Sequence, residues 1–196
     1  MKRLALIEKI QNYTSLETEE VVFKENMVDF IQSNVDCFER SLESGHITAS
    51  AVLLNKDGSK VLLMHHAKLN LWVQLGGHCD GDPDVLAVAV KEAQEESGIM
   101  SIKPVHENIF DIDIHFIPAN SREKAHYHYD VRFLLQVTSN EEVVQNSESK
   151  ELRWIDINAH EMPTKERSVV RLFEKLSRLV TPLASADQQN ISIKVL

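Results

Sequence analysis

The chain has 196 residues, 43% hydrophobic and 26% charged, which predicts one folded domain with a sizeable core and excludes a disordered protein. Its formal net charge of −9 disfavours nucleic acids and anionic membranes as partners, although a divalent cation could still hold a small anionic substrate. Because no apolar run could span a bilayer, no signal-peptide core begins the chain and only two cysteines occur, we expect a cytoplasmic protein without disulfides.

Residues 1–44 are expected to form a helical extension of two helices. Thr14 and Glu17 predict a capping box at the start of the second helix, and Gly45 is expected to end the extension. Neither helix would be stable alone, so the extension needs a surface to pack on, within one chain or in a homodimer. The apolar side chains at helical spacing are Leu6, Ile10 and Tyr13, and then Phe23, Met27, Phe30 and Ile31.

After residue 45 the pattern changes to β-branched and apolar runs separated by turns. A hairpin is predicted around Lys56, Asp57 and Gly58. Strands are expected over 47–54, 60–64, 71–75, 102–117, 127–137 and 152–155. Helices are expected over 83–97 and in a last segment whose apolar stripe is Val169, Leu172, Phe173, Leu176, Leu179 and Val180, with Pro182 ending it. This order favours an α+β fold with a domain over 45–182 and a tail over 183–196.

The helix expected over 83–97 has well-defined ends. Asp82 is predicted to be the N-cap, Pro83 to occupy the first helical position, and Gly98 to close the helix. Leu86, Val90 and Ala93 are expected to form its apolar side.

Three carboxylates crowd the last turns of the same helix. Glu92, Glu95 and Glu96 lie at i, i+3 and i+4, where like charges repel and also oppose the helix dipole. A solvated acidic face would explain the pattern, and so would a site for a hard divalent cation. Both interpretations are open from the residues alone.

The spacing of this segment resembles the Nudix box of the Nudix hydrolases. Two positions depart from the family pattern, since Pro83 replaces a glutamate and Lys91 replaces an arginine that form an ion pair in the family. The match extends over about residues 47–160. The positions that agree are Gly77, Glu92, Ala93, Glu95, Glu96, Gly98 and Ile99.

The resemblance implies the Nudix fold, an α/β/α sandwich around a mixed β-sheet. It also implies that a divalent metal ion, Mg²⁺ or Mn²⁺, supports hydrolysis of a pyrophosphate bond in a nucleoside diphosphate linked to another moiety. By similarity, Glu92, Glu95, Glu96 and the Gly76 carbonyl would hold the metal. Glu95 and Glu96 would serve catalysis, with a box glutamate or Glu148 as the general base.

Two other functions remain alternatives. An enzyme similar to isopentenyl-diphosphate isomerase would explain the Gly77–His78 pair and the many histidines, but that family has a cysteine where this chain has Gly76. A non-catalytic nucleotide-binding module would explain the departures at Pro83 and Lys91. Retention of all three glutamates disfavours such a module.

Nine histidines occur in the chain, and several alternate with acidic residues along the expected strands. His126, His128 and Asp130 would share one face, and so would Asp111, Asp113 and His115. If these strands pair, the two triplets would line one wall that contacts substrate, holds a second metal ion or faces solvent.

Separate predictions apply to several other polar residues, within the box and outside it. His78 follows Gly77 and is expected near the phosphates, and Lys91 is a further candidate for substrate contact. Arg132 is expected to be solvated at the surface and Cys79 to be an inert loop residue. His65 and His66 should point to opposite faces and not share a metal ion.

Overall fold

The computed structural model describes residues 2–119 and 124–180, so the predicted tail 183–196 and the helix stop at Pro182 lie outside it. Within that described part, no helix combines the length and the apolar character needed to cross a membrane. The elements are α1 (Lys2–Asn12), α2 (Thr18–Ser33), β1 (Gly45–Leu54), β2 (Lys60–His66), β3 (Trp72–Val73), β4 (Leu75–His78), α3 (Val85–Ser97), β5 (Ile102–Pro104), β6 (Asp111–Ile117), β7 (His126–Val137), β8 (Ser149–Asp156) and α4 (Arg167–Val180). They confirm the α+β class.

The strands are hydrogen-bonded in the order β3-β2-β1-β7-β5, and β4, β6 and β8 additionally pair with β1, β7 and β2. Contacts divide the chain into two compact units, and β1, β7 and α3 pass from one unit into the other. The first unit holds the described residues of Met1–Ala51, Gly76–Glu92 and Pro104–Leu134, and the second those of Val52–Leu75, Ala93–Lys103 and Leu135–Leu196.

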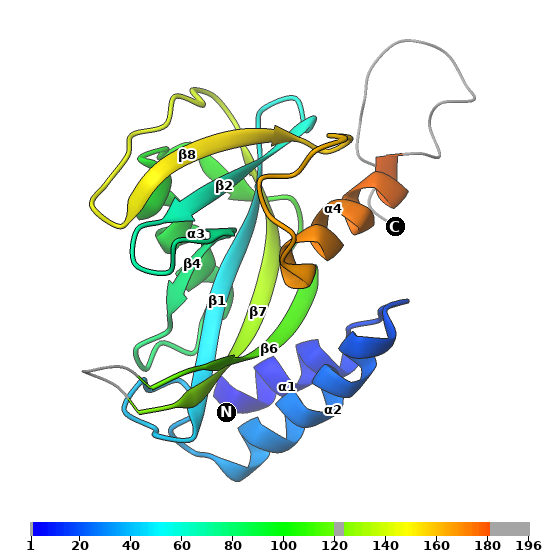
Figure 1. The fold of residues 1–196 in the computed structure, drawn as a ribbon. Coiled ribbons are helices and arrows are strands. Elements are labelled where there is room, and N and C mark those ends of the chain that lie inside the picture. The colour runs from blue at the N-terminus through cyan, green and yellow to red at the C-terminus, as the bar shows by residue number, and fades with distance from the viewer. Residues whose placement is uncertain (1, 120–123, 181–196) are drawn as a thin grey trace. The chain divides into compact units, whose positions relative to one another are not determined.

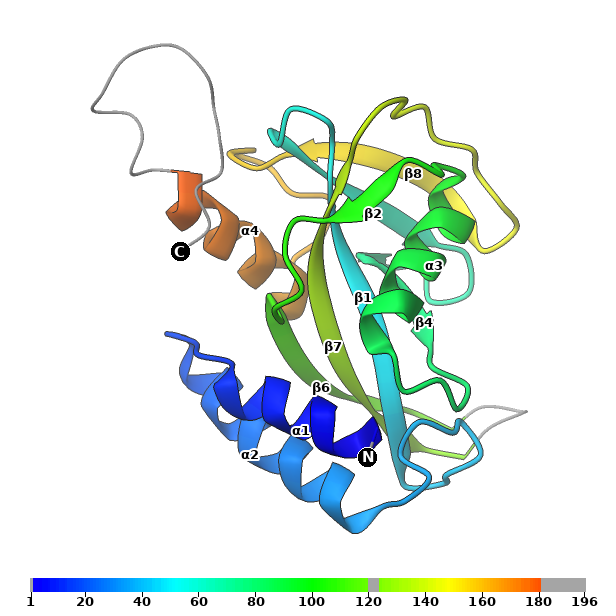
Figure 2. The same cartoon turned by 180° about the vertical axis from the view of Figure 1, so that it is seen from behind.

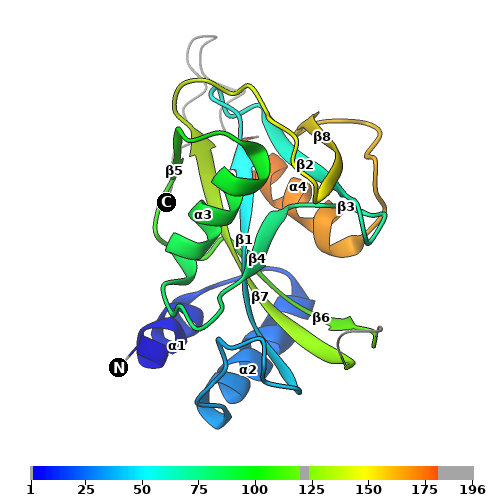
Figure 3. The same cartoon turned by 90° about the vertical axis from the view of Figure 1, so that its left-hand side faces the viewer.

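In the first unit, β1 lies between β4 and β7, and β6 extends this arrangement by pairing with β7 (Figure 3). The β6–β7 pairing is antiparallel and runs from Asp111 opposite Arg132 to Ile117 opposite His126. Helices α1 and α2 lie side by side, and α2 packs on β6 (Figures 1 and 2). The buried apolar residues of the two helices are Leu6, Ile7, Ile10, Met27, Phe30 and Ile31. They include most of the apolar positions predicted from the helical spacing.

A buried carboxylate fastens this helical pair to β6. Glu20 is completely buried and accepts hydrogen bonds from the Tyr13 hydroxyl at 2.7 Å, the Ser15 hydroxyl and the Ile112 backbone N–H at 3.1 Å. Burial and the adjacent Glu20 carboxylate raise the pKa of Tyr13, so its hydroxyl stays a donor. The contacts join the α1–α2 turn to the strand.

The predicted capping box is wrong. Helix α2 begins at Thr18, and its N-cap residue Glu17 makes no side-chain cap. Ser15, not Thr14, supplies the local acceptor, since its hydroxyl receives the Glu17 backbone N–H at 3.0 Å. The turn is therefore built around Ser15 and the buried Glu20.

In the second unit, β2 is paired with β8, with β3 and, at Leu54 opposite Val61, with the end of β1. The β2–β8 register runs from Lys60 opposite Asp156 and shifts at a bulge between His65 and His66. Helix α4 buries most of its predicted stripe, whereas Leu179 remains 45% exposed. The buried members are Val169, Leu172, Phe173 and Leu176.

The single strand expected over 102–117 is in fact two strands. Strand β5 stops at Pro104, which lacks a backbone N–H, and the polar segment after it leaves the regular pairing. Only isolated backbone bonds remain there, such as Val105 N–H to the Leu134 carbonyl at 3.0 Å. Regular pairing returns with β6.

We predict that Glu20→Ala lowers the free energy of unfolding by about 2–4 kcal/mol, because it removes the buried carboxylate that accepts hydrogen bonds from Tyr13, Ser15 and the Ile112 backbone N–H. Chemical denaturation of Glu20→Ala and of the unchanged chain measures the loss of stability. Glu25→Ala is the matched control, since Glu25 is exposed on the same helix and should change stability by less than about 0.5 kcal/mol. Equal losses in the two variants would contradict the anchoring role.

Candidate active site

Two glycines in the middle of β4 let neighbouring groups approach closely. Gly76 has φ +156°, and a Cβ there would lie 2.7 Å from the Ala49 carbonyl oxygen of β1. A Cβ on Gly77 would lie 2.5 Å from Oε2 of Glu92. The Glu92 carboxylate therefore lies directly on the Gly77 backbone, and any side chain at Gly77 would displace it.

The loop between β4 and α3 is braced by the segment that precedes β1. The Arg40 guanidinium donates two hydrogen bonds to Asp80, and the Gly81 backbone N–H donates to the Phe38 carbonyl at 3.0 Å. The hydrogen bond from Arg40 holds the pKa of Asp80 below its usual value. Burial raises the pKa of the adjacent Cys79 thiol, as expected for an inert residue.

The start of α3 differs from the prediction by two residues. Asp84 is the N-cap, because its carboxylate accepts the Ala87 backbone N–H at 3.1 Å. Asp82 instead accepts the Asp84 backbone N–H at 3.0 Å, which orders the turn before the helix. Pro83 consequently precedes the helix.

The three glutamates of the motif lie on α3 with different exposures. Glu92 has 18% of its side chain exposed, and its Oε1 lies 3.6 Å from Lys91 Nζ. Glu95 is exposed, whereas Glu96 is only 3% exposed. The interpretation of the three glutamates as a solvated acidic face is therefore wrong at Glu96. The apolar side also differs, since Ala93 is buried but Leu86 and Val90 are only partly covered.

Lys91 and Glu148 are solvent-facing candidates. The Lys91 side chain is 63% exposed and its ammonium group is near Glu92. Glu148 is exposed in the segment before β8, where its backbone carbonyl accepts the Ala67 N–H at 2.8 Å. The roles expected for these two residues stay predictions.

The expected pairing of the two polar triplets is confirmed. In the β6–β7 hairpin, Asp113 lies opposite Asp130 and His115 opposite His128, so the alternating polar side chains share one face. The opposite face carries Ile114, where a cavity of about 440 Å³ lies beside α2. The other cavity-lining residues are Asn26, Asp29, Phe30, Ser33, Tyr127 and Tyr129, with the Phe30 and Tyr129 rings stacked at 3.8 Å.

Arg132 was expected at the surface but is only 1% exposed, at the base of this polar face. Its guanidinium contacts three carboxylates, Asp130 at 2.7 Å, Asp111 at 3.1 Å and Asp113 at 3.3 Å. The nearby carboxylates raise the pKa of Arg132 against the opposing effect of burial, so the group stays charged. Three carboxylates around one guanidinium leave an excess of formal negative charge.

Asp130 is itself held from two strands. Besides Arg132, it accepts hydrogen bonds from the hydroxyls of Thr48 at 3.0 Å and Ser50 at 2.8 Å on β1. It is 1% exposed, so its carboxylate lies within this buried network.

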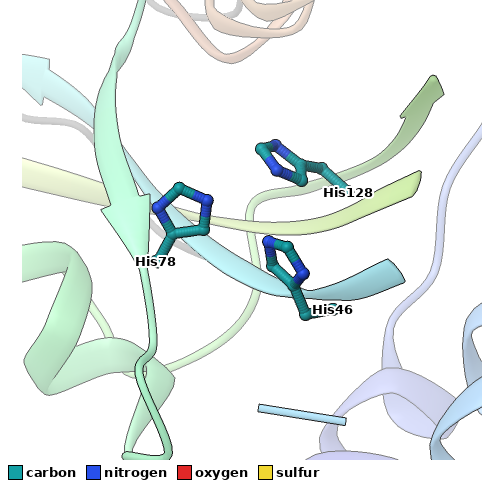
Figure 4. A group of neighbouring side chains, drawn as sticks. All are labelled: His46, His78 and His128. Carbon is teal, nitrogen blue, oxygen red and sulfur yellow. The ribbon is translucent and has the colours of Figure 1, made fainter. Parts of the chain in front are cut away.

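Above the network, the imidazoles of His46, His78 and His128 converge from β1, β4 and β7 (Figure 4). One ring nitrogen of each lies within 4.8 Å of the others. The predicted His78 and His128 are thus brought together, but His46 was missed. The signal for it was the polar alternation of His46, Thr48 and Ser50 along an otherwise apolar strand.

Two further histidines surround this group. The His126 Nδ1–H donates to the Lys124 carbonyl at 2.7 Å, which leaves its Nε2 3.2 Å from Nε2 of His128. His115 lies 3.1 Å from the Asp113 carboxylate, and its ring is 5.2 Å from that of His128. Burial and the neighbouring imidazoles lower the pKa of His128 to about 2, so its ring is neutral at physiological pH.

We predict that Arg132→Met lowers the free energy of unfolding by about 3–5 kcal/mol, because it strands buried carboxylates without their cation. Denaturant titration measures the loss. Arg153→Met serves as the comparison, since Arg153 pairs with Glu151 at the surface and should contribute less than about 1 kcal/mol. A small effect at Arg132 would show that the buried network is not held by its guanidinium.

A model of the NUDIX domain matches residues 45–174. A relative from Lactococcus lactis subsp. cremoris, named "Probable DHNTP pyrophosphohydrolase", is 25% identical over 169 residues, which cover 85% of this chain and 95% of the relative.

Solved structures show the same fold. A MutT NUDIX hydrolase from Burkholderia pseudomallei has 20% identity and a TM-score of 0.52, with coverage of 68% of this chain and 98% of that structure. The E. coli dihydroneopterin triphosphate pyrophosphohydrolase has 16% identity and a TM-score of 0.51, with coverage of 66% and 92%. The predicted Nudix fold is confirmed, and because the domain model spans most of the sequence, the chain belongs to the Nudix family of hydrolases.

Proposed function

We propose that this protein uses a divalent metal ion to hydrolyse a pyrophosphate bond in a nucleoside diphosphate linked to another moiety. The observation that carries the proposal is the Glu92 carboxylate lying on Gly77, at the junction of strand, loop and helix where the Nudix motif is found. The spacing of the motif alone does not determine where the Glu92 carboxylate points. Because Gly77 has no Cβ, the Glu92 carboxylate has room to lie against the Gly77 backbone.

The donor groups fit a hard cation. Carboxylates of Glu92, Glu95 and Glu96 and the carbonyl of Gly76 are oxygen ligands, which Mg²⁺ and Mn²⁺ prefer. Glu95 and Glu96 follow Glu92 on the same helix α3, near its negative C-terminal end. A bound cation would offset both the repulsion between the carboxylates and their conflict with the helix dipole.

When bound, the metal ion supplies charge neutralisation on the phosphate oxygens and activation of the attacking water. Residues of the chain would hold the metal ion and orient the substrate beside it. Gly77 leaves room for the Glu92 carboxylate, and Lys91 would place a positive charge beside that carboxylate, where it could also attract an anionic substrate. Glu95, Glu96 or Glu148 would accept the proton of the attacking water, and His78, His126, His128 and Asp130 are candidates for positioning the substrate.

We predict that Glu92→Gln and Glu96→Gln each lower kcat/KM for metal-dependent hydrolysis on the order of 100-fold or more, because each removes a charged ligand. Release of phosphomonoester from substrate with Mg²⁺ measures the rate. Glu142→Gln should retain full activity, since Glu142 is exposed outside the motif. Undiminished hydrolysis in Glu96→Gln would overturn the proposed reaction.

The substrate is sought with a panel of nucleoside diphosphate derivatives in Mg²⁺ or Mn²⁺. Dihydroneopterin triphosphate, which is a pterin triphosphate and not a nucleoside derivative, is added to the panel because the name of the Lactococcus relative contains DHNTP. We expect hydrolysis of at least one member and no turnover without metal. Isopentenyl diphosphate is the comparison for isomerase chemistry, and no interconversion is expected because position 76 is glycine. Metal-independent binding of all members without turnover would favour a non-catalytic module instead.

A further inference from the structure

We infer that His46, His78 and His128 form a second metal site, selective for a borderline transition metal such as Zn²⁺ over Mg²⁺. The three residues come from the adjacent strands β4, β1 and β7, and their rings point toward one another (Figure 4). Three imidazoles with an open fourth position are the ligand number of many zinc sites. The site is separate from the oxygen donors of the Nudix motif and does not rest on the proposed hydrolysis.

The distances support shared ligation. Ring centroids are 4.9 Å apart for His46 and His78, 4.8 Å for His46 and His128, and 5.1 Å for His78 and His128. One nitrogen of each ring lies within 4.8 Å of the others. With Zn–N bonds of about 2.0–2.1 Å, the nitrogens of two tetrahedral ligands lie roughly 3.3 Å apart. Rotations of the rings that move each nitrogen by about an ångström would therefore complete the site.

A fourth imidazole is already at ligand spacing. Nε2 of His126 is 3.2 Å from Nε2 of His128, close to the roughly 3.3 Å expected between two ligands of one tetrahedral ion. Its Nδ1–H is held by the Lys124 carbonyl, the outer contact that commonly orients a ligating imidazole. His126 thus contacts the trio through His128, whereas the three ligand nitrogens within 4.8 Å of one another belong to His46, His78 and His128.

The surroundings favour a cation. The buried network beneath the rings, Arg132 with Asp111, Asp113 and Asp130, has more carboxylates than cations. Closely packed imidazoles offer ring nitrogens, which are common metal ligands in the neutral state. A single divalent ion satisfies several rings with one charge centre. Nitrogen donors also discriminate against Mg²⁺, which prefers oxygen.

The test is Zn²⁺ binding to the full chain in the presence of a large excess of Mg²⁺, which occupies oxygen sites. Isothermal titration and metal analysis after dialysis should give one tightly bound Zn²⁺ per chain. Co²⁺ should show the strong visible absorption of a low-coordinate nitrogen site. Bound Zn²⁺ should also raise the Tm.

His46→Gln and His128→Gln should each weaken Zn²⁺ binding beyond the roughly 10–100-fold that loss of an outer contact costs, and abolish the Tm increase. His160→Gln is the matched control, since His160 is exposed in the second unit, and it should bind Zn²⁺ as the unchanged chain does. Because His46 is buried, His78→Gln on the partly exposed end of β4 provides a variant whose fold is less at risk.

Circular dichroism confirms that each variant is folded before binding is measured. Glu92→Gln separates this site from the proposed catalytic metal, because it should lose hydrolysis yet keep the Zn²⁺ stoichiometry. No Zn²⁺ binding under excess Mg²⁺, or equal binding in folded His46→Gln, His78→Gln and His128→Gln variants, would overturn the inference.

Discussion

Residues two positions apart on a strand share a face, and along β1, β6 and β7 that face is polar. Arg132 stabilises this polar face, because its guanidinium contacts carboxylates from both β6 and β7. A slip of one residue in this hairpin would turn Arg132 and its partners to the opposite face and bury unpaired charge. The register that satisfies Arg132 is also the register that places His115 opposite His128. A charged network thereby positions the imidazoles.

The first unit offers two donor chemistries at neighbouring positions of one short strand. Gly77 of β4 seats a carboxylate, while His78, the next residue, turns an imidazole toward β1 and β7. Oxygen donors suit hard cations that also bind phosphates, and nitrogen donors suit borderline transition metals. Selectivity of this kind comes from ligand type more than from raw affinity.

The sequence predicted most elements governed by local rules and missed the residues governed by long-range packing. Two local predictions were also wrong, the capping box at Thr14 and Glu17 and the single strand over 102–117. The order of strands, the β6–β7 hairpin and the extent of α3 follow from period-two and helical patterns, and cap assignment was wrong by only two residues at Asp84. Arg132 was misplaced because a lone arginine is usually solvated, and only the convergence of three distant carboxylates reverses that preference. His46 was missed because its partners come from strands far along the chain. Burial of Glu96 depends on what covers α3, which helical periodicity does not reveal.

The hydrogen bond from the Ile112 amide to Glu20 reaches between two members of the charged network, since Ile112 separates Asp111 from Asp113 on β6. The Nudix domain match starts at residue 45, and a protein trimmed to the matched region would begin there. Such trimming would remove the Glu20 carboxylate that accepts this hydrogen bond and uncover the strand face on which α2 packs. The first 33 residues are thus part of the scaffold of the site, and protein engineering of this chain should treat them as inseparable from it.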